Sequence, residues 1–339
     1  MKAMMLRELG GPLKFEEVEV PKVGPGEALV RVAACGVGYT VSRTRRRGIV
    51  PRIPGHEVAG QIVEVGEGVV NVKEGDRVAV YFYLNCGTCK YCRIGRETLC
   101  LNLGGLIGVD TDGGYAEYTK LPAQNCIKLP QEISYLDGSI VADAICTPWK
   151  VMKERAKVKP LDDVLIVGAG GGVGIHAVAM ARLFGGRVIA ADISEEKLKA
   201  ARKAGAEAAI NTKTKVLDEE AKRLTGGKGM DVVIDFTGIP QMLEAGLNSL
   251  AIAGRLVTLA GGSVPNVDMS KVSFGELVIT GSRYVTKQEL TETIEVVRRG
   301  MIKAIIGKTF PLEEADVAHQ MVDQNKVVGR AALVIWEGE

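Results

Sequence analysis

No stretch of the sequence is apolar over the length that a membrane span or a signal sequence requires, and this includes residues 1–11. An excess of charge of either sign is also missing, because 43 Lys and Arg residues face 41 Asp and Glu residues. Such a balance is not typical of nucleic-acid-binding proteins. Asn and Gln are sparse while Glu, Lys and Arg are plentiful, which favours a heat-adapted (thermophile) source. We therefore expect a cytoplasmic protein, without a nucleic-acid or membrane partner, that acts on a small molecule.

The length and the hydrophobic pattern predict two domains. A chain of 339 residues exceeds what one hydrophobic core usually fills. Short strands separated by Gly and Pro are expected at 15–20, 27–32, 56–65 and 77–80, which indicates a β-rich first domain. Between 151 and 284, expected strands at 164–167, 187–191, 208–210, 232–236, 256–260 and 277–280 alternate with helical stretches. This alternation predicts an α/β region with a doubly wound parallel sheet. An amphipathic helix at 290–299 and a strand at 331–336 follow.

A glycine turn follows the first strand of the α/β region and precedes a helix. Its residues are Gly168, Gly170, Gly171, Gly172, Val173 and Gly174. Such a turn lets the backbone and the helix N-terminus approach a pyrophosphate, and an acid at the end of the next strand, here Asp192, can hold a ribose hydroxyl. The pattern predicts a dinucleotide site, and the alternative is a tight turn without a ligand. Asp192 favours NAD(H), because a carboxylate repels a 2′-phosphate, while Lys197 and Arg202 leave NADP(H) open.

Four of the seven cysteines lie in one loop, at Cys86, Cys89, Cys92 and Cys100. This spacing is typical of a closed, tetrahedral zinc site that has no open position for a substrate. We expect one structural zinc per chain in this loop. The alternative is four thiols with unrelated roles.

These motifs resemble those of a known family. The segment Gly55-His56-Glu57, the cysteine loop and the glycine turn resemble the zinc-containing medium-chain dehydrogenase/reductase family, which includes the zinc alcohol dehydrogenases. The resemblance runs nearly end to end. It implies a GroES-like catalytic domain, residues 1–150 and 285–339, around a Rossmann domain at 151–284. It also implies a homodimer or homotetramer, and a cofactor site that includes Thr237 and Gly238.

The resemblance also implies a catalytic zinc, but one ligand position is changed. In the family, a Cys of a G-V-C-x-T-D segment, the His of G-H-E, and a later Cys or Asp hold this zinc. Gly38 stands where the thiolate is expected, and Cys35 lies three residues too early to replace it. The candidate ligands that remain are His56, Glu57 and Asp143. Each could instead have a purely structural role, and without the thiolate the affinity for zinc should fall.

Other candidate site residues follow from the same resemblance. Thr40 stands where the family places a hydroxyl that relays a proton, although it could instead cap the local backbone. Tyr39, Trp149 and Tyr284 are candidates for the substrate pocket or for ordinary packing. Basic side chains gather at Arg43, Arg45, Arg46 and Arg47, either as a solvated loop face or as contacts to a phosphate-bearing substrate.

Three functions are compatible with these residues. The first is an NAD(P)-dependent alcohol dehydrogenase or ketone reductase with a weakened catalytic zinc site at His56, Glu57 and Asp143. The second is a zinc-independent reductase of conjugated double bonds, such as an enone or enoyl-thioester reductase of the acryloyl-CoA reductase type. It is suggested by Gly38, by Val41 where the family has Asp, and by the glycine spacing. The third is a dinucleotide-binding protein without catalysis. The first is preferred, because three candidate ligands remain.

Overall fold

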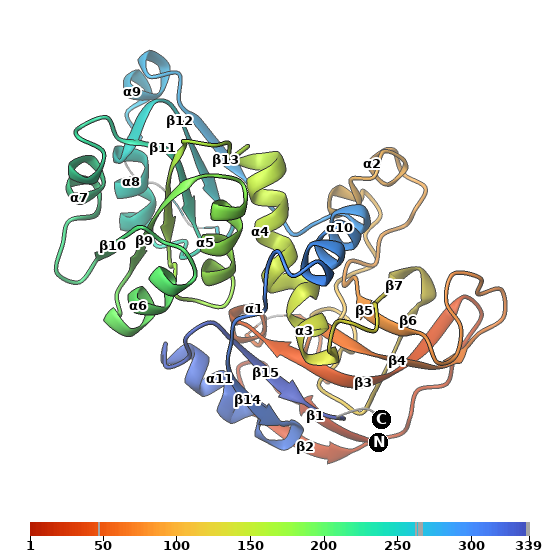
Figure 1. Ribbon diagram of the computed structural model, residues 1–339. Coiled ribbons are helices and arrows are strands. Elements are labelled where there is room, and N and C mark those ends of the chain that lie inside the picture. The colour runs from red at the N-terminus through yellow and green to blue at the C-terminus, as the bar shows by residue number, and fades with distance from the viewer. Residues whose placement is uncertain (47, 262, 264–266, 337–339) are drawn as a thin grey trace. The chain divides into compact units, whose positions relative to one another are not determined.

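The computed structural model describes residues 1–46, 48–261, 263 and 267–336 (Figure 1). The chain forms two compact units, residues 1–146 with 285–339, and residues 147–284. Arg47 of the predicted basic run lies outside the described residues. Within the described ranges, no helix is both long and apolar enough to cross a membrane.

The first unit is built on a seven-stranded sheet of the order β14-β15-β3-β4-β5-β7, with β6 paired to β3, and on a separate two-stranded sheet β1-β2. The strands are β1 Lys2–Leu6, β2 Leu13–Glu17, β3 Glu27–Val37, β4 Glu57–Val65, β5 Arg77–Val80, β6 Tyr118–Pro122, β7 Cys126–Lys128, β14 Ile306–Pro311 and β15 Arg330–Val334. The helices are α1 Tyr39–Thr44, α2 Lys90–Arg93, α3 Tyr135–Ile140, α10 Lys287–Arg298 and α11 Ala315–Asp323, with short turns at Glu97–Leu99, Ala123–Asn125 and Leu312–Glu314.

Strand β3 organises this unit. Its mostly apolar sequence is almost entirely buried, because strands pair along both of its edges and helices α3 and α11 pack against it. It continues five residues beyond the predicted end at 32, since residues 33–37 are small or β-branched and pair with both β4 and β15. Helix α10 begins at Lys287, earlier than predicted, because Thr286 and Glu289 form a capping box.

A continuous helical run leads from the first unit into the second. It consists of α3, a π-helical segment at Val141–Ile145, α4 at Cys146–Lys150, and a second π-helical segment at Val151–Arg155. Asp143 lies in the first π-helical segment. A π-turn widens the helix and often marks a functional position.

The second unit is a Rossmann fold. Its parallel sheet has the order β10-β9-β8-β11-β12-β13, with the strands β8 Asp163–Val167, β9 Arg187–Asp192, β10 Ala208–Asn211, β11 Met230–Asp235, β12 Leu250–Thr258 and β13 Val278–Gly281. The helices are α5 Gly174–Leu183, α6 Glu195–Lys203, α7 Leu217–Leu224, α8 Pro240–Asn248 and α9 Met269–Phe274. Helix α5 packs with α6, and α7 packs with α8, on opposite faces of the sheet (Figure 1). The predicted doubly wound sheet is confirmed, and its order reverses between β8 and β11.

Candidate active site and metal centres

The glycine turn after β8 has the geometry of a close backbone approach. Gly168 adopts a φ of 79°, and its N–H donates to the carbonyl of Ala191 over 2.9 Å. A Cβ added at Gly174, the first residue of α5, would overlap the carbonyl of Gly168. The turn therefore brings the N-terminus of α5 against the end of β8, where its free N–H groups can bind a pyrophosphate.

Asp192 closes one side of this turn. Its Oδ2 accepts a hydrogen bond from the Gly170 N–H over 2.9 Å, and its Oδ1 accepts one from the Ile193 N–H over 2.8 Å. Burial lowers the pKa of the nearby Lys197, against the pull of the Asp192 charge. A Cβ added at Gly170 would lie 2.7 Å from the Cγ of Lys197, so only glycine fits beside this lysine.

Thr237 and Gly238 lie at the end of β11, next to the glycine turn. The carboxylate of Asp235 accepts hydrogen bonds from the Thr237 hydroxyl over 2.6 Å and from the Gly238 N–H over 2.8 Å. A Cβ added at Gly168 would lie 3.1 Å from the Cγ2 of Thr237. The ends of β8 and β11 thus meet at the point where the strand order reverses, which is where doubly wound sheets bind their ligands.

His176 supports the turn from within α5, a role that the sequence does not reveal. Its Nδ1 lies 2.6 Å from the carbonyl oxygen of Gly172. Burial lowers the pKa of His176 to about 4, so the ring is neutral at pH 7 and Nδ1 carries the donated proton.

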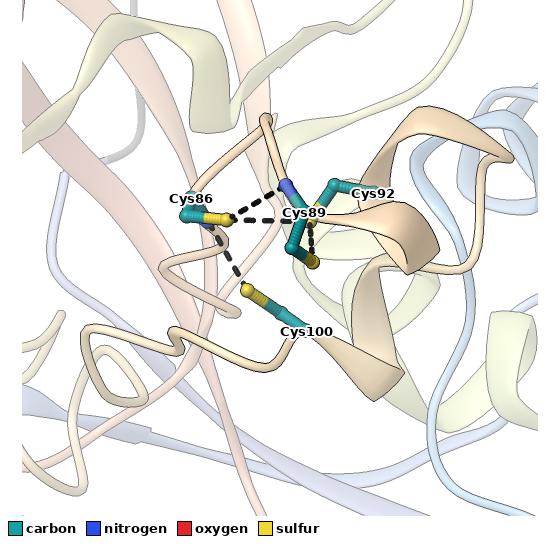
Figure 2. A group of neighbouring side chains, drawn as sticks. All are labelled: Cys86, Cys89, Cys92 and Cys100. Carbon is teal, nitrogen blue, oxygen red and sulfur yellow. Dashed lines mark hydrogen bonds between the residues drawn. The ribbon is translucent and has the colours of Figure 1, made fainter.

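The four cysteines of the loop converge on one point (Figure 2). The Sγ atoms of Cys89 and Cys92 lie 3.6 Å apart, and those of Cys86 and Cys92 lie 4.0 Å apart. Zinc with four sulfur ligands at about 2.3 Å places them about 3.8 Å from one another, so the cluster has the size of a tetrahedral zinc site.

Hydrogen bonds donated to the sulfurs of Cys86 and Cys100 stabilise the negatively charged thiolate form. The Thr88 hydroxyl donates to the Sγ of Cys86 over 3.6 Å and lowers the pKa of Cys86 to about 5. The N–H of Cys86 donates to the Sγ of Cys100 over 3.3 Å. Burial raises the pKa of Cys92 to about 12, and its hydrogen bond with Cys89 acts in the same direction. The residues fit zinc, which would let all four sulfurs ionise.

The second candidate metal site lies on three adjacent strands of the first unit. Glu57 begins β4 and pairs with Gly36 of β3, while Ala331 of β15 pairs with Val37. Arg330, which precedes Ala331, therefore lies beside Gly38. Because side chains alternate along a strand, Gly36, Gly38, Glu57 and Arg330 share one face. The two glycines leave an open strip on that face between Arg330 and Glu57.

The Arg330 side chain fills this strip. Its Nε donates to the Oε2 of Glu57 over 3.0 Å, and its Nη2 contacts the Oε1 of the same carboxylate. The Nη2 also lies 3.8 Å from the Oδ2 of Asp143. A Cβ added at Gly38 would lie 2.5 Å from the Cζ of Arg330, so the guanidinium occupies the space of a side chain at 38. Burial lowers the pKa of Arg330 to about 10, and the group stays charged at pH 7.

The three predicted ligands lie together next to this ion pair. The Nε2 of His56 lies 3.4 Å from the Oδ2 of Asp143 and 3.6 Å from the Oε1 of Glu57. The ring of His56 packs edge-on against Phe82, with centroids 4.6 Å apart. These distances alone suit a metal with ligands at about 2.0–2.2 Å.

Two further features make a catalytic metal at this site a poor fit. Glu57 already forms an ion pair with Arg330, so one candidate ligand is occupied. Metal-bound histidines almost always donate their second ring nitrogen to an acceptor, yet the buried Nδ1 of His56 has no hydrogen-bond partner among the described residues. Cys35 offers no substitute, because its Sγ lies on the opposite face of β3, near Gly55 and Gly114, and burial raises its pKa.

The remaining predicted residues are placed as follows. Thr40 lies in the first turn of α1, half-buried, and Tyr39 before it is 58% exposed. In the second unit, Trp149 packs edge-on against Phe184, and Tyr284 is buried. Within the basic run, Arg45 forms an ion pair of 2.9 Å with Asp316 and so has a structural partner.

A parallel sheet with a dinucleotide turn in one unit, and a histidine–carboxylate cluster on a β-sheet in the other, define an oxidoreductase of the alcohol dehydrogenase class. Residues 24–131 match the family of alcohol dehydrogenase GroES-like domains, and residues 172–299 match the zinc-binding dehydrogenase family. The chain belongs to the zinc-containing medium-chain dehydrogenase/reductase family, as the sequence predicted.

Relatives of two activities match the chain over nearly its full length. A NAD-dependent alcohol dehydrogenase of Sulfolobus acidocaldarius is 35% identical, with 99% of this chain and all of that protein covered. An acryloyl-coenzyme A reductase of Sulfurisphaera tokodaii is 32% identical over 96% of this chain and 98% of that protein. A solved structure of a NAD-dependent alcohol dehydrogenase superimposes with a TM-score of 0.93 at 32% identity, over 99% of this chain and all of the other.

Proposed function

We propose that this oxidoreductase interconverts an alcohol and a carbonyl compound with a nicotinamide cofactor, on a small-molecule substrate. The observation that carries the proposal is the contact between the buried His56 and the partly buried Asp143, 3.4 Å apart, in a chain that matches NAD-dependent alcohol dehydrogenases end to end. Oxidation of a secondary alcohol removes a hydride from carbon and a proton from oxygen, and reduction of a ketone reverses both. The nicotinamide ring exchanges the hydride when it is bound.

The chain's own residues would hold the cofactor and move the proton. The turn from Gly168 to Gly174, with Val173, would hold the pyrophosphate on the N-terminus of α5. Asp192 would accept a hydrogen bond from the ribose 2′-hydroxyl, which favours NAD(H) over NADP(H). Thr40 would relay the substrate proton, and His56 with Asp143 would act as the buried proton acceptor. Tyr39, Trp149 and Tyr284 stay candidates for the substrate pocket.

The cysteine loop would hold one structural zinc. Its four sulfurs lie within 4.8 Å of one another, and a site of four thiolates leaves no position for a substrate. The zinc would therefore stabilise the loop between β5 and β6 and take no part in the reaction.

The test is a screen of purified enzyme with NAD⁺ or NADP⁺ against secondary alcohols, and with the reduced cofactors against ketones. We expect turnover with NAD(H) and a loss of at least about a hundredfold in kcat/KM for His56→Ala, since general acid–base groups contribute about 10²–10⁴-fold. Tyr118→Phe, a half-buried tyrosine of β6, is the matched control and should retain activity. Turnover that is unchanged in His56→Ala would exclude the proposed role of His56.

A second candidate function is reduction of a conjugated double bond, for example in an enoyl thioester. It is favoured by Gly38, which removes the thiolate of the family's metal site, because the conjugated carbonyl can carry the developing charge itself. The acryloyl-coenzyme A reductase relative lends it further support. Consumption of NAD(P)H with enoyl thioesters, but with no ketone in the same screen, would favour this function over the first.

The third possibility, a dinucleotide-binding protein without catalysis, would require that no compound of either screen is turned over. A homodimer or homotetramer, a cytoplasmic location, a thermophilic source and the choice between NAD and NADP stay predictions. Sedimentation equilibrium and titration of each cofactor by fluorescence test the assembly and the cofactor choice directly.

A further inference from the structure

We propose that Arg330 takes the place of the family's catalytic metal, and that the cluster of His56, Glu57 and Asp143 binds no zinc. The guanidinium fills the space of the missing side chain at 38 and carries the positive charge that the carboxylates need. Whether this cluster holds a metal is independent of which of the two reactions considered above the enzyme catalyses.

A side chain at position 38 would overlap Arg330. The ideal Cβ position at Gly38 lies 2.5 Å from the Cζ and 2.6 Å from the Nη1 of Arg330. A cysteine at 38 and the observed Arg330 rotamer therefore exclude each other. Arg330 is only 6% exposed, so its head group cannot simply turn into solvent. The observed conformation of Arg330 therefore requires glycine at position 38.

Arg330 also compensates the charge of Glu57. Glu57 is fully buried, and a buried carboxylate is strongly destabilising unless a cation and hydrogen bonds compensate it. Arg330 provides both, since its Nε donates to Oε2 and its Nη2 contacts Oε1. A planar guanidinium suits two carboxylate oxygens in this way. A divalent cation at the same place would meet the guanidinium at close range and be repelled by it.

The surroundings of His56 differ from those of a metal-bound histidine. Its Nε2 faces both carboxylates, whereas its buried Nδ1 has no hydrogen-bond partner in the described part of the chain. The outer hydrogen bond that normally orients a metal-binding imidazole is missing. In the cysteine loop, by contrast, backbone N–H groups and Thr88 support the sulfurs.

The decisive measurement is zinc per chain, by elemental analysis of the full chain purified with added zinc and then dialysed. We expect one zinc in the wild type, one in His56→Ala and none in Cys100→Ser. Two zinc ions in the wild type, with one lost in His56→Ala, would overturn the proposal. This comparison needs no activity measurement, so its outcome is independent of the proposed reaction.

A restoration experiment tests the role of Arg330 itself. The double variant Gly38→Cys/Arg330→Ala removes the guanidinium and returns the thiolate, and we expect it to bind a second zinc that the further change His56→Ala removes. Gly38→Ala/Arg330→Ala, which lacks the thiolate, is the matched control and should bind the second zinc at least tenfold more weakly. If the cysteine variant folds and still holds one zinc, Arg330 is not what excludes the metal. If it fails to fold, the wild-type and His56→Ala stoichiometries still decide the question.

Discussion

Two clusters of metal-ligating side chains lie in the first unit, and they differ in what occupies their centre. The four sulfurs of the loop from Cys86 to Cys100 lie within 4.8 Å of one another, and backbone N–H groups and the Thr88 hydroxyl donate hydrogen bonds to them. The donors of His56, Glu57 and Asp143 are equally close to one another, but the guanidinium of Arg330 contacts one of them and approaches another. The spacing of the donor atoms is thus similar in the two clusters, but in the second a cationic side chain of the protein already contacts a candidate ligand.

The comparison shows that proximity of donor atoms is not enough to define a metal site. Four neighbouring thiolates repel one another, so the cysteine loop can ionise fully only when a cation from outside offsets their charge. A pair of carboxylates with an internal arginine is already compensated, and a metal would have to displace that arginine.

The largest effect is expected in the cysteine loop. Cys100→Ser should release the zinc and unfold the segment from Cys86 to Cys100, because the binding free energy of structural zinc, about 10–16 kcal/mol in zinc-finger peptides, is also folding free energy. Elemental analysis and the temperature of thermal unfolding measure both consequences. Cys126→Ala, which removes a buried thiol of β7 outside the loop, should keep its zinc. A stable Cys100→Ser protein with unchanged zinc content would mean that the loop does not bind the metal.

The next effect concerns the Arg330–Glu57 pair. Arg330→Met should cost about 3–5 kcal/mol of unfolding free energy, because it leaves a buried carboxylate without its cation. Glu57→Gln should also destabilise the protein, but the double variant should cost clearly less than the sum of the two. Urea denaturation of all four proteins gives the coupling energy. Additive effects would show that the two groups do not depend on each other, and would remove the contrast between the clusters.

Much of the fold could be predicted from the sequence because strand and helix periods alternate clearly in the second unit. Strand β5 was expected at the residues that form it, and β8 to β11 within two residues of theirs. Strand β12 begins at Leu250, six residues before the predicted start. The reason is local: Ala253 has a φ of 59°, and the pairing with β11 shifts before Arg255. Because the first half of β12 is irregular, the alternating pattern on which a strand prediction depends is interrupted there.

The candidate site was predictable only in part. His56, Glu57 and Asp143 were found through motifs, and the structure brings them together. Arg330 was missed, because it lies 273 residues from Glu57 and belongs to no local motif. The available signal was a single arginine at the start of an apolar strand, in a chain where Gly38 replaces a larger side chain. Such a pair becomes visible only when the register of β15, β3 and β4 is known.

A buried base that stays neutral gives a smaller effect and sharpens the contrast with the charged Arg330. His319 of α11 lies 2.9 Å from the hydroxyl of Tyr115 and 3.2 Å from that of Ser42, and burial, assisted by the charge of Arg45, lowers its pKa to about 3. Asp316 acts in the opposite direction, and His56 in the same one.

Because the unfolded chain takes up a proton on this histidine near pH 6.5 and the folded chain does not, stability should fall as the pH drops below 6.5. The slope is about 1.4 kcal/mol per pH unit, and about 3 kcal/mol is lost by pH 4. Urea denaturation at several pH values should show this loss in the wild type and a flatter profile in His319→Gln. Equal profiles for the two proteins would place the neutral, buried state of His319 in doubt.

The smallest effect concerns the hydrogen bonds that the cysteine sulfurs accept. Among the described residues, the Nδ1 of His56 has no such outer hydrogen bond. The Thr88 hydroxyl donates to the Sγ of Cys86, and Thr88→Val removes this donor while keeping the shape of the side chain. Loss of one outer hydrogen bond typically weakens metal affinity about tenfold or more, so the loop should still bind zinc but release it to a weaker chelator. Competition with a chromophoric chelator measures the change, and Thr119→Val, at a buried threonine of β6 outside the loop, is the matched variant. If Thr88→Val binds zinc as tightly as the wild type, then convergence of the sulfurs alone fixes the affinity, and the missing partner of His56 Nδ1 loses its weight as an argument against a metal there.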